Sequence, residues 1–145
     1  METQSIDDVL ADFQGYLNLI FARARTMWRE SASRMHPELQ PAGYKLLAFI
    51  SRTGPTNAHQ LAERFEMDKS MVSRQIRMLE EFDLLESRPD EHDGRLRVLT
   101  ATPEASRVLA VLRGEHAERM RAVLAELTPE EVKAASKAFS LLAEV

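Results

Sequence analysis

Cysteine is absent from this sequence, and its absence excludes several kinds of chemistry. Disulfide bonds, zinc sites built from thiolates and peroxide sensing through a cysteine all require that residue. The chain also lacks any run of about 18 apolar residues, so no membrane span is expected. Its N-terminal stretch METQSIDDVLADF is acidic and has no apolar centre, unlike a signal peptide. The expected location is the reducing cytoplasm, so we predict a cytoplasmic protein.

A surplus of positive charge is missing as well. Lys and Arg number 19 against 23 Asp and Glu, which gives a formal net charge of −4. A surface for nucleic acid would therefore have to gather its cations locally. With 145 residues and 44% hydrophobic content, the chain suits a single domain over residues 1–145 with a real core.

Motifs of the common enzyme classes are missing too. None of the four histidines belongs to an HExxH motif or has a second histidine four residues away. No glycine-rich phosphate loop, Gly-x-Ser-x-Gly elbow or Ser–His signature is present. The segment DEHD, residues 90–93, could hold a cation, but it is more typical of a polar turn in which Gly94 takes a positive φ. We predict a protein that is not an enzyme and that uses no cofactor and no metal ion.

What the sequence does contain is a series of helical patterns. Apolar residues recur at three- and four-residue steps over residues 5–33 and again over residues 42–52. Asn57 followed by Gln60 resembles a capping box. This pair predicts a short helix that ends near Phe65.

Three more helix starts carry cap residues. Asp68 is a good N-cap for a helix over about residues 68–82. The motif Thr-Pro-Glu occurs at residues 102–104 and again at residues 128–130. In this motif threonine caps, proline fits the first helical position and the acid favours the positive end of the helix dipole. The two helices that follow are predicted to reach about residues 127 and 142.

Two strands are predicted between these helices, near residues 85–88 and 96–101. Two short helices joined by a tight turn and followed by a hairpin indicate a winged helix-turn-helix. We therefore predict a mostly α-helical α+β fold with a winged helix-turn-helix lobe over residues 42–102. Within it, residues 68–82 form the recognition helix and residues 85–101 form the wing.

The outer helices, residues 1–35 and 103–145, lie outside that lobe and are not needed to form it. Their apolar stripes need a surface that covers them. Packing against a second copy of the chain is the simplest solution, so we predict a homodimer. The predicted dimer interface includes Phe13, Leu17, Val132, Phe139 and Leu142.

The predicted recognition helix has two chemically different sides when its residues are placed about 100° apart. One side is apolar, with Gln75 as its one polar member. The other side, the polar arc, carries hydroxyls and cations without an acid. Arginine and serine in the N-terminal half of such a helix can reach base edges and phosphates in a major groove. The polar arc consists of Lys69, Ser70, Ser73, Arg74 and Arg77.

The charge balance around the polar arc keeps other interpretations open. Across residues 68–97, six basic residues stand against eight acidic ones, so a DNA surface requires the cations to share a face and the acids to pair or point away. A solvated helix face is one alternative. A protein-interaction module without DNA binding is another, because a winged helix does not fix a function. The acid-free polar arc favours DNA, because an interaction surface has no need of it.

The segment DKSMVSRQIRMLEEFDLLESRPDEHDGRLRVLTATPEA resembles the multiple-antibiotic-resistance regulator (MarR) family of bacterial repressors. Its most specific part is Asp93-Gly94-Arg95, which matches the family's Asp-x-Arg in the wing. LAERFEMDKSMVSRQIRMLEE resembles the family's helix-turn-helix, and the strong match covers about residues 57–105. The resemblance implies a dimer that regulates transcription by binding a pseudo-palindromic operator in double-stranded DNA. It also implies a repressor that a small effector, often an aromatic anion, releases from DNA.

Matching positions carry the roles that the resemblance implies. Thr56 and Gln60 would lie near phosphates, while the hydroxyls and arginines of the polar arc would face the major groove. Arg95 would enter the minor groove, and Asp93 would orient it or pair with a neighbouring cation. Arg97 could either contact a phosphate or be a solvated strand residue. The predicted DNA-binding residues are Thr56, Gln60, Lys69, Ser70, Ser73, Arg74, Arg77, Asp93, Arg95 and Arg97.

Three positions depart from the family pattern. Asp83 stands where a glycine usually forms a left-handed helix cap, a conformation that Asp tolerates at some cost. Ser87 replaces an arginine before the wing, which removes one expected phosphate contact. Ala101 replaces a leucine, which leaves the wing with a smaller apolar contact to the core.

A candidate effector site lies near the end of the first predicted helix. Met27 and Trp28 are close to the place where family members keep an effector crevice, and Tyr44 would face it from the second helix. A ligand carboxylate there could pair with an arginine. Ordinary core and dimer packing is the alternative, because Met and aromatic residues at helical spacing are usually core. The arginines in reach are Arg23, Arg25 and Arg29.

Overall fold

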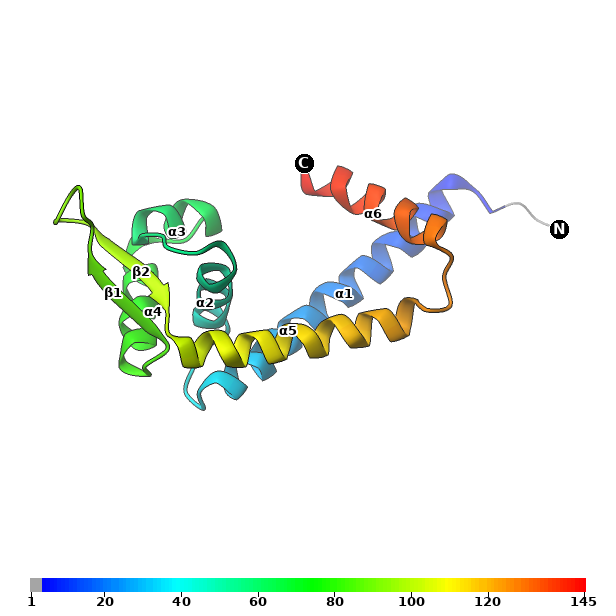
Figure 1. The fold of residues 1–145 in the computed structure, drawn as a ribbon. Helices are drawn as coiled ribbons and strands as arrows, with labels where there is room; N and C mark the ends of the chain where they lie inside the picture. Colours follow the sequence, from blue (N-terminus) through cyan, green and yellow to red (C-terminus); the bar gives the residue numbers. More distant parts are fainter. Residues whose placement is uncertain (1–3) are drawn as a thin grey trace. The chain divides into compact units, whose positions relative to one another are not determined.

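The computed structural model describes residues 4–145, which form six helices and one antiparallel hairpin (Figure 1). The order of elements is the predicted one, and the mostly α-helical fold with a small hairpin is confirmed. The elements are α1 (Ile6–Met35), α2 (Pro41–Thr53), α3 (Ala58–Phe65), α4 (Lys69–Glu81), β1 (Leu85–Pro89), β2 (Arg97–Ala101), α5 (Pro103–Leu124) and α6 (Pro129–Ala143).

The chain divides into two compact units, one reaching to Leu109 and the other spanning Ala110–Val145. The first unit contains α1 to α4, the hairpin and the first residues of α5. The second contains the rest of α5 and α6. The prediction of a single domain with dimerisation helices at residues 1–35 and 103–145 stays a prediction. No helix within residues 4–145 combines the length and the apolar character needed to cross a membrane.

The predicted capping box at the start of α3 is only half formed. The side chain of Asn57 accepts a hydrogen bond from the backbone N–H of Gln60 at 2.9 Å, as expected for an N-cap. The side-chain oxygen of Gln60 does not return to Asn57, because it accepts the hydroxyl of Thr56 at 2.8 Å instead. The box at Thr128 and Glu131, by contrast, is complete in both directions.

The end of α4 is tied directly to the start of α5. Asp83, just after the helix, has a φ of 58°, the left-handed conformation that its place in the family pattern implied. The hydroxyl of Thr102 donates to the carbonyl of Asp83 at 3.0 Å and accepts the backbone N–H of Ala105 at 3.2 Å. One threonine therefore satisfies groups at two helix ends and fixes the base of the hairpin.

The hairpin is held on both edges of β2. Leu85 pairs with Ala101 and Pro89 with Arg97 in antiparallel register. On the other edge, Leu99 exchanges two backbone hydrogen bonds with Thr56, at 2.8 and 3.2 Å. The wing is thereby attached to the connection between α2 and α3.

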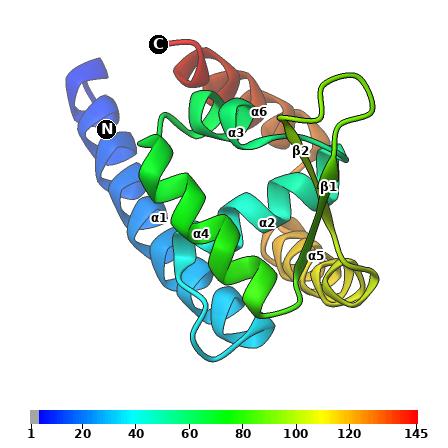
Figure 2. The same ribbon diagram turned by 90° about the vertical axis from the view of Figure 1, so that its left-hand side faces the viewer.

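The core of the first unit surrounds α2, which contacts α1, α4 and β2. Figure 2 shows α2 enclosed behind α4 and the hairpin. The rings of His36, after α1, and Phe82, after α4, stack with centroids 3.7 Å apart. Tyr44 and Ile50 of α2 are buried, whereas Phe65 of α3 is only half buried. Fully buried side chains include Leu46, Leu47, Ile50, Leu61, Val72, Leu79 and Leu99.

A tight contact joins the start of α2 to the inner side of α4. Gln75 is buried, and its amide nitrogen donates to the side-chain oxygen of Gln40 at 2.8 Å. A Cβ added at Gly43 would lie 2.7 Å from Cδ1 of Leu39 and 2.9 Å from Oε1 of Gln75. Both distances are shorter than real Cβ contacts, so the ends of the Leu39 and Gln75 side chains would have to move to make room for a Cβ at this position.

Gly43→Ala is therefore expected to lower the free energy of unfolding by up to about 2 kcal/mol, the overpacking cost less the gain in helix propensity. Gly114→Ala is the matched control, since a Cβ there meets nothing within 4 Å in the described part of the chain. It should leave stability unchanged or raise it by up to about 1 kcal/mol. Urea unfolding of both variants checks this, and equal shifts would contradict the close contact.

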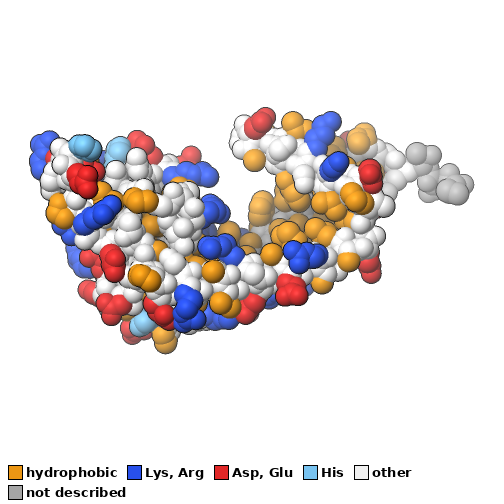
Figure 3. All heavy atoms as spheres, viewed as in Figure 1, with side chains coloured by type: hydrophobic (Ala, Val, Ile, Leu, Met, Phe, Trp, Pro, Cys, Tyr) orange, Lys and Arg blue, Asp and Glu red, His pale blue; other side chains and the backbone are white. Residues whose placement is uncertain are grey.

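Large apolar side chains remain exposed in both units. In α1 the helical pattern seen in the sequence points to the surface rather than into the core of the first unit. Figure 3 shows hydrophobic side chains gathered on the visible surface outside the winged helix-turn-helix. Exposed examples are Ile6, Val9, Leu10, Phe13, Tyr16, Leu19, Ile20 and Phe21 in α1, and Val111, Met120, Val123, Leu127, Phe139, Leu141 and Leu142 in the second unit.

Candidate nucleic-acid interface

The structure divides α4 into an exposed side and a buried side, in agreement with the sequence pattern. All five residues of the polar arc are exposed. On the opposite side Val72, Gln75, Ile76 and Leu79 are buried. The apolar contacts fix the rotation of α4 about its axis, so the polar arc is turned outward by packing and not by its own charges.

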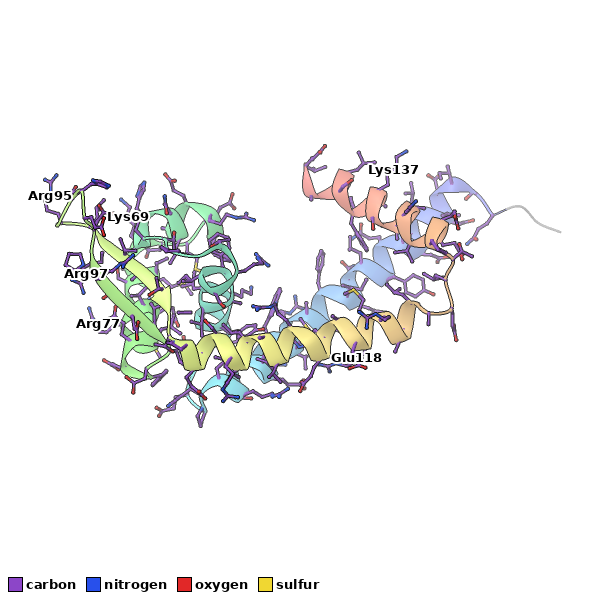
Figure 4. All side chains as sticks on the ribbon, viewed as in Figure 1. Lys69, Arg77, Arg95, Arg97, Glu118 and Lys137 are labelled. Atoms are coloured by element: carbon purple, nitrogen blue, oxygen red, sulfur yellow. The ribbon has the colours of Figure 1, made fainter. Side chains whose placement is uncertain are left out.

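The hairpin shares this face with α4. Figure 2 looks onto the face and shows α4 and the two strands nearest the viewer. Figure 4 places Lys69, Arg77, Arg95 and Arg97 close to one another within the first unit, on α4 and the hairpin. Cations that are dispersed among acids in the sequence are therefore collected on one surface, which meets the first condition for a DNA contact.

Three of the neighbouring acids are engaged by local donors. Asp68 caps α4 and accepts the hydroxyl of Ser70 at 2.8 Å and its backbone N–H at 3.3 Å. Asp90 accepts the backbone N–H groups of His92 at 2.8 Å and Asp93 at 3.0 Å. Asp93 accepts the backbone N–H and the Nε of Arg95, both at 3.1 Å.

The same hydrogen bonds lower the pKa values of these three carboxyls. The Ser70 hydroxyl and N–H lower the pKa of Asp68, and the N–H groups of His92 and Asp93 lower that of Asp90. The Arg95 side chain and N–H lower the pKa of Asp93. A depressed folded pKa means that the stabilisation is present above the unfolded pKa and is lost as pH falls through the folded value. The helix cap and the wing turn are therefore intact at neutral pH and loosen only in acid.

The tip of the wing is built differently from the prediction. Gly94 does not have a positive φ, so the prediction that it turns the chain in this way is wrong. The turn is closed by the N–H of Leu96, which donates to the carbonyl of Asp93 at 3.0 Å, and by the two aspartates described above. Carboxylates that accept backbone N–H groups stabilise a turn without a left-handed residue. Among residues 4–145 no group of three or more His, Asp or Glu is arranged to hold a metal ion.

The two wing arginines are held in different ways. The side chain of Arg95 is 92% exposed and is paired with Asp93, the arrangement expected of a residue that Asp93 orients. Arg97 crosses the hairpin, and its Nη2 donates to the carbonyl of Ser87 at 3.1 Å and to its hydroxyl at 2.9 Å. Arg97 is therefore a fixed strand residue and not a freely solvated one.

The predicted phosphate contacts Thr56 and Gln60 lie together before and on α3. Their mutual hydrogen bond occupies the carbonyl oxygen of Gln60 and leaves its amide nitrogen as a donor. Both residues line a hollow of about 480 Å³ beside Phe49 and Arg64. The guanidinium carbons of Arg52 and Arg64 lie 5.9 and 5.7 Å from the centre of the Phe49 ring, a cationic cluster that the sequence reading missed.

A second hollow, of about 510 Å³, lies between α1 and the start of α2. Of the three predicted effector residues, Trp28 alone lines it, because Tyr44 is buried and Met27 lies outside the lining. The Nζ of Lys45 is 3.8 Å from the centre of the Trp28 ring. No pattern in the sequence pairs Lys45 with Trp28, since helix packing creates the contact. The lining residues are Ala22, Arg25, Trp28, Arg29, Pro41 and Lys45.

Comparisons with known proteins agree with this geometry. The model of the MarR family matches residues 39–96, from just before α2 to the wing tip. YxaD of Bacillus subtilis strain 168, an HTH-type transcriptional regulator, is 29% identical over 107 residues, which are 74% of this chain and 75% of that protein. The structure of YusO from Bacillus subtilis has a TM-score of 0.70 at 25% identity over 98% of this chain and 99% of that chain.

A structure of Streptococcus pneumoniae FabT in complex with DNA is also similar. Its TM-score is 0.80 at 15% identity, over 93% of this chain and 95% of that chain, which shows a shared fold. The family match, the related sequence and the shared fold agree with one another. Residues 39–96 therefore match the MarR family of transcriptional regulators, and the chain is similar in sequence to a transcriptional regulator of the HTH type.

Proposed function

We propose that the protein is a cytoplasmic, homodimeric repressor that binds a pseudo-palindromic site in double-stranded DNA. The observation that carries the proposal is the acid-free polar arc of α4, exposed on the same face as the wing cations Arg95 and Arg97. The similarity in fold to FabT, which was solved with DNA, supports it.

Each exposed group suits one part of a duplex. Arg74 and Ser73 on α4 would read base edges in the major groove, where arginine can bridge O6 and N7 of guanine. Arg95 would enter the minor groove from the wing tip, where a narrow groove attracts cations. Thr56 and Gln60 would contact phosphates through the hydroxyl and the amide nitrogen.

A dimer would bring two such surfaces to one site. The exposed apolar side chains of α1 and of the second unit supply the surface for association, since large apolar patches mark interfaces. In a two-fold dimer the two α4 helices would enter major grooves about one helical turn, roughly 34 Å, apart. Occupancy of such a site beside a promoter would block transcription.

A salt titration of DNA binding tests the proposal. The duplex would be the DNA upstream of the protein's own gene, followed by gel shift or fluorescence anisotropy. We expect affinity to fall steeply with salt despite the net charge of −4, because each phosphate contact releases counterions. An affinity that does not change with salt concentration, or no binding to any duplex, would contradict the proposal and favour a protein-interaction module.

We further propose that a small aromatic anion binds in the hollow at Trp28. The indole offers a flat apolar face, and Arg25, Arg29 and Lys45 offer cationic partners for a carboxylate. A ligand can change operator affinity only if it binds one arrangement of the lobes better than the other. Because α2 lies against α4, a ligand that shifts the start of α2 would also shift the recognition helix.

The single tryptophan makes this site directly observable. Benzoate is expected to change the fluorescence of Trp28 in a saturable way, and cyclohexanecarboxylate to do so more weakly. Lys45→Ala should weaken benzoate binding by about tenfold, the loss of one charge-assisted contact. Lys133→Ala, on α6, is the control. An unchanged benzoate titration in Lys45→Ala would remove Lys45 from the site.

A further inference from the structure

The register of the hairpin puts Arg97 on a particular face. Residues paired across an antiparallel ladder share a face, so Ser87, Leu99 and Arg97 lie on the same side as Leu85. Leu85 and Leu99 are buried, and this side is therefore the one turned toward the core of the first unit. Arg97 stands at its outer end, where the strand has passed beyond the core and the side chain is exposed.

Ser87 accepts two hydrogen bonds from one nitrogen of the Arg97 guanidinium. Its carbonyl and hydroxyl oxygens both accept from Nη2 of Arg97, at 3.1 and 2.9 Å. Within residues 4–145 the other guanidinium nitrogens of Arg97 have no hydrogen-bond partner and remain available as donors. A long side chain that is held in one place before binding loses less freedom when it binds.

The partners of Arg97 are neutral, and this distinguishes it from Arg95. Arg95 is bound by the carboxylate of Asp93, which compensates its charge in the free protein. The carbonyl and hydroxyl of Ser87 orient Arg97 without neutralising it. Arg97 therefore presents a fixed and uncompensated positive charge, which suits a phosphate.

Its position also matches the path of a DNA strand. Figure 4 shows Arg97 between Arg77 of α4 and Arg95 of the wing tip, all within the first unit. If α4 occupies a major groove and Arg95 the next minor groove, the phosphate backbone that separates the two grooves passes between them. Arg97 is a cation of the hairpin at that place.

We propose that Ser87 is a positioning residue that holds Arg97 for a contact with this backbone phosphate. The inference rests on the proposed DNA binding and adds to it a residue absent from the predicted contact set.

The test uses the full-length protein, a duplex selected from random sequences by repeated binding, and an unrelated duplex of equal length. Arg97→Ala should weaken binding to both duplexes by about tenfold and reduce the slope of log affinity against log salt by about 0.9, one phosphate. Ser87→Ala should weaken binding by roughly two- to tenfold. Ser87→Thr, which keeps the hydroxyl, should restore it.

The double variant separates positioning from a structural role. In the Arg97→Ala background, Ser87→Ala should have no further effect, because nothing is left to position. Arg88→Ala is the matched control, since Arg88 is an exposed arginine of β1 on the opposite face of the hairpin from Arg97. Its slope should stay close to that of the parent chain, and melting temperatures should show that all variants fold.

Different failures have different meanings. If Ser87→Ala leaves DNA affinity unchanged, or if it lowers affinity as much in the Arg97→Ala background as in the parent chain, the positioning role of Ser87 is overturned. If Arg97→Ala keeps the full salt slope while Arg95→Ala weakens binding, this inference falls and the DNA-binding proposal stands. If the unaltered protein binds neither duplex, both fall together.

Discussion

Replacing Phe13 with glutamate is expected to separate the protein into monomers and to lower its operator affinity by about 100- to 10,000-fold. Phe13 is 39% exposed on α1 among other exposed apolar side chains, so the subunit itself does not need it for its core. A carboxylate in a closed apolar interface would be buried without a partner. A monomer holds only one half-site and loses the gain that comes from linking two binding events.

Sedimentation velocity measures the first part of this prediction and operator titration the second. Gln14→Glu is the matched control, because Gln14 is the exposed polar neighbour of Phe13 and hydrogen bonds to Asn18 on the same helix. Gln14→Glu adds the same negative charge one residue away from Phe13 and should leave the dimer intact. A dimer that survives Phe13→Glu with full affinity would exclude this face of α1 from the interface.

Arg74→Ala is expected to cost about 1–3 kcal/mol of operator affinity, a factor of roughly 5–150, and to relax the preference for one base pair. Arg74 is exposed on the polar arc, six residues after the N-cap Asp68 of α4. An arginine there can form two parallel hydrogen bonds with guanine, which no other base pair offers in the same geometry. Its loss should therefore affect the selected site more than an unrelated duplex.

The measurement is a set of affinities for the selected site and its single-base variants. Arg107→Ala is the control, an exposed arginine on α5 that pairs with Glu104 at 2.6 Å. If Arg74→Ala keeps both the affinity and the base preference, α4 does not read the sequence. A uniform loss on all duplexes would instead make Arg74 a phosphate contact like the one proposed for Arg97.

The helices and the winged helix-turn-helix could be predicted from the sequence because their signals are local. Cap residues such as Asp68 and Thr128 act within one helical turn, and the spacing of apolar residues assigns the buried side of α4 without knowledge of its neighbours. The left-handed conformation of Asp83 was implied by the family resemblance, since a glycine usually stands at its place. The exposure of the whole polar arc followed from the same periodicity.

What the sequence could not determine depends on residues brought together by packing. Gln60 bonds to Thr56 rather than completing a cap, and Gly94 needs no positive φ because neighbouring carboxylates close its turn. Lys45 meets Trp28 across two helices, and Ser87 meets Arg97 across the hairpin. Periodicity determines which side of an element faces the core. Only the tertiary structure decides which side chain of another element lies opposite, because that choice depends on how all the elements pack at once.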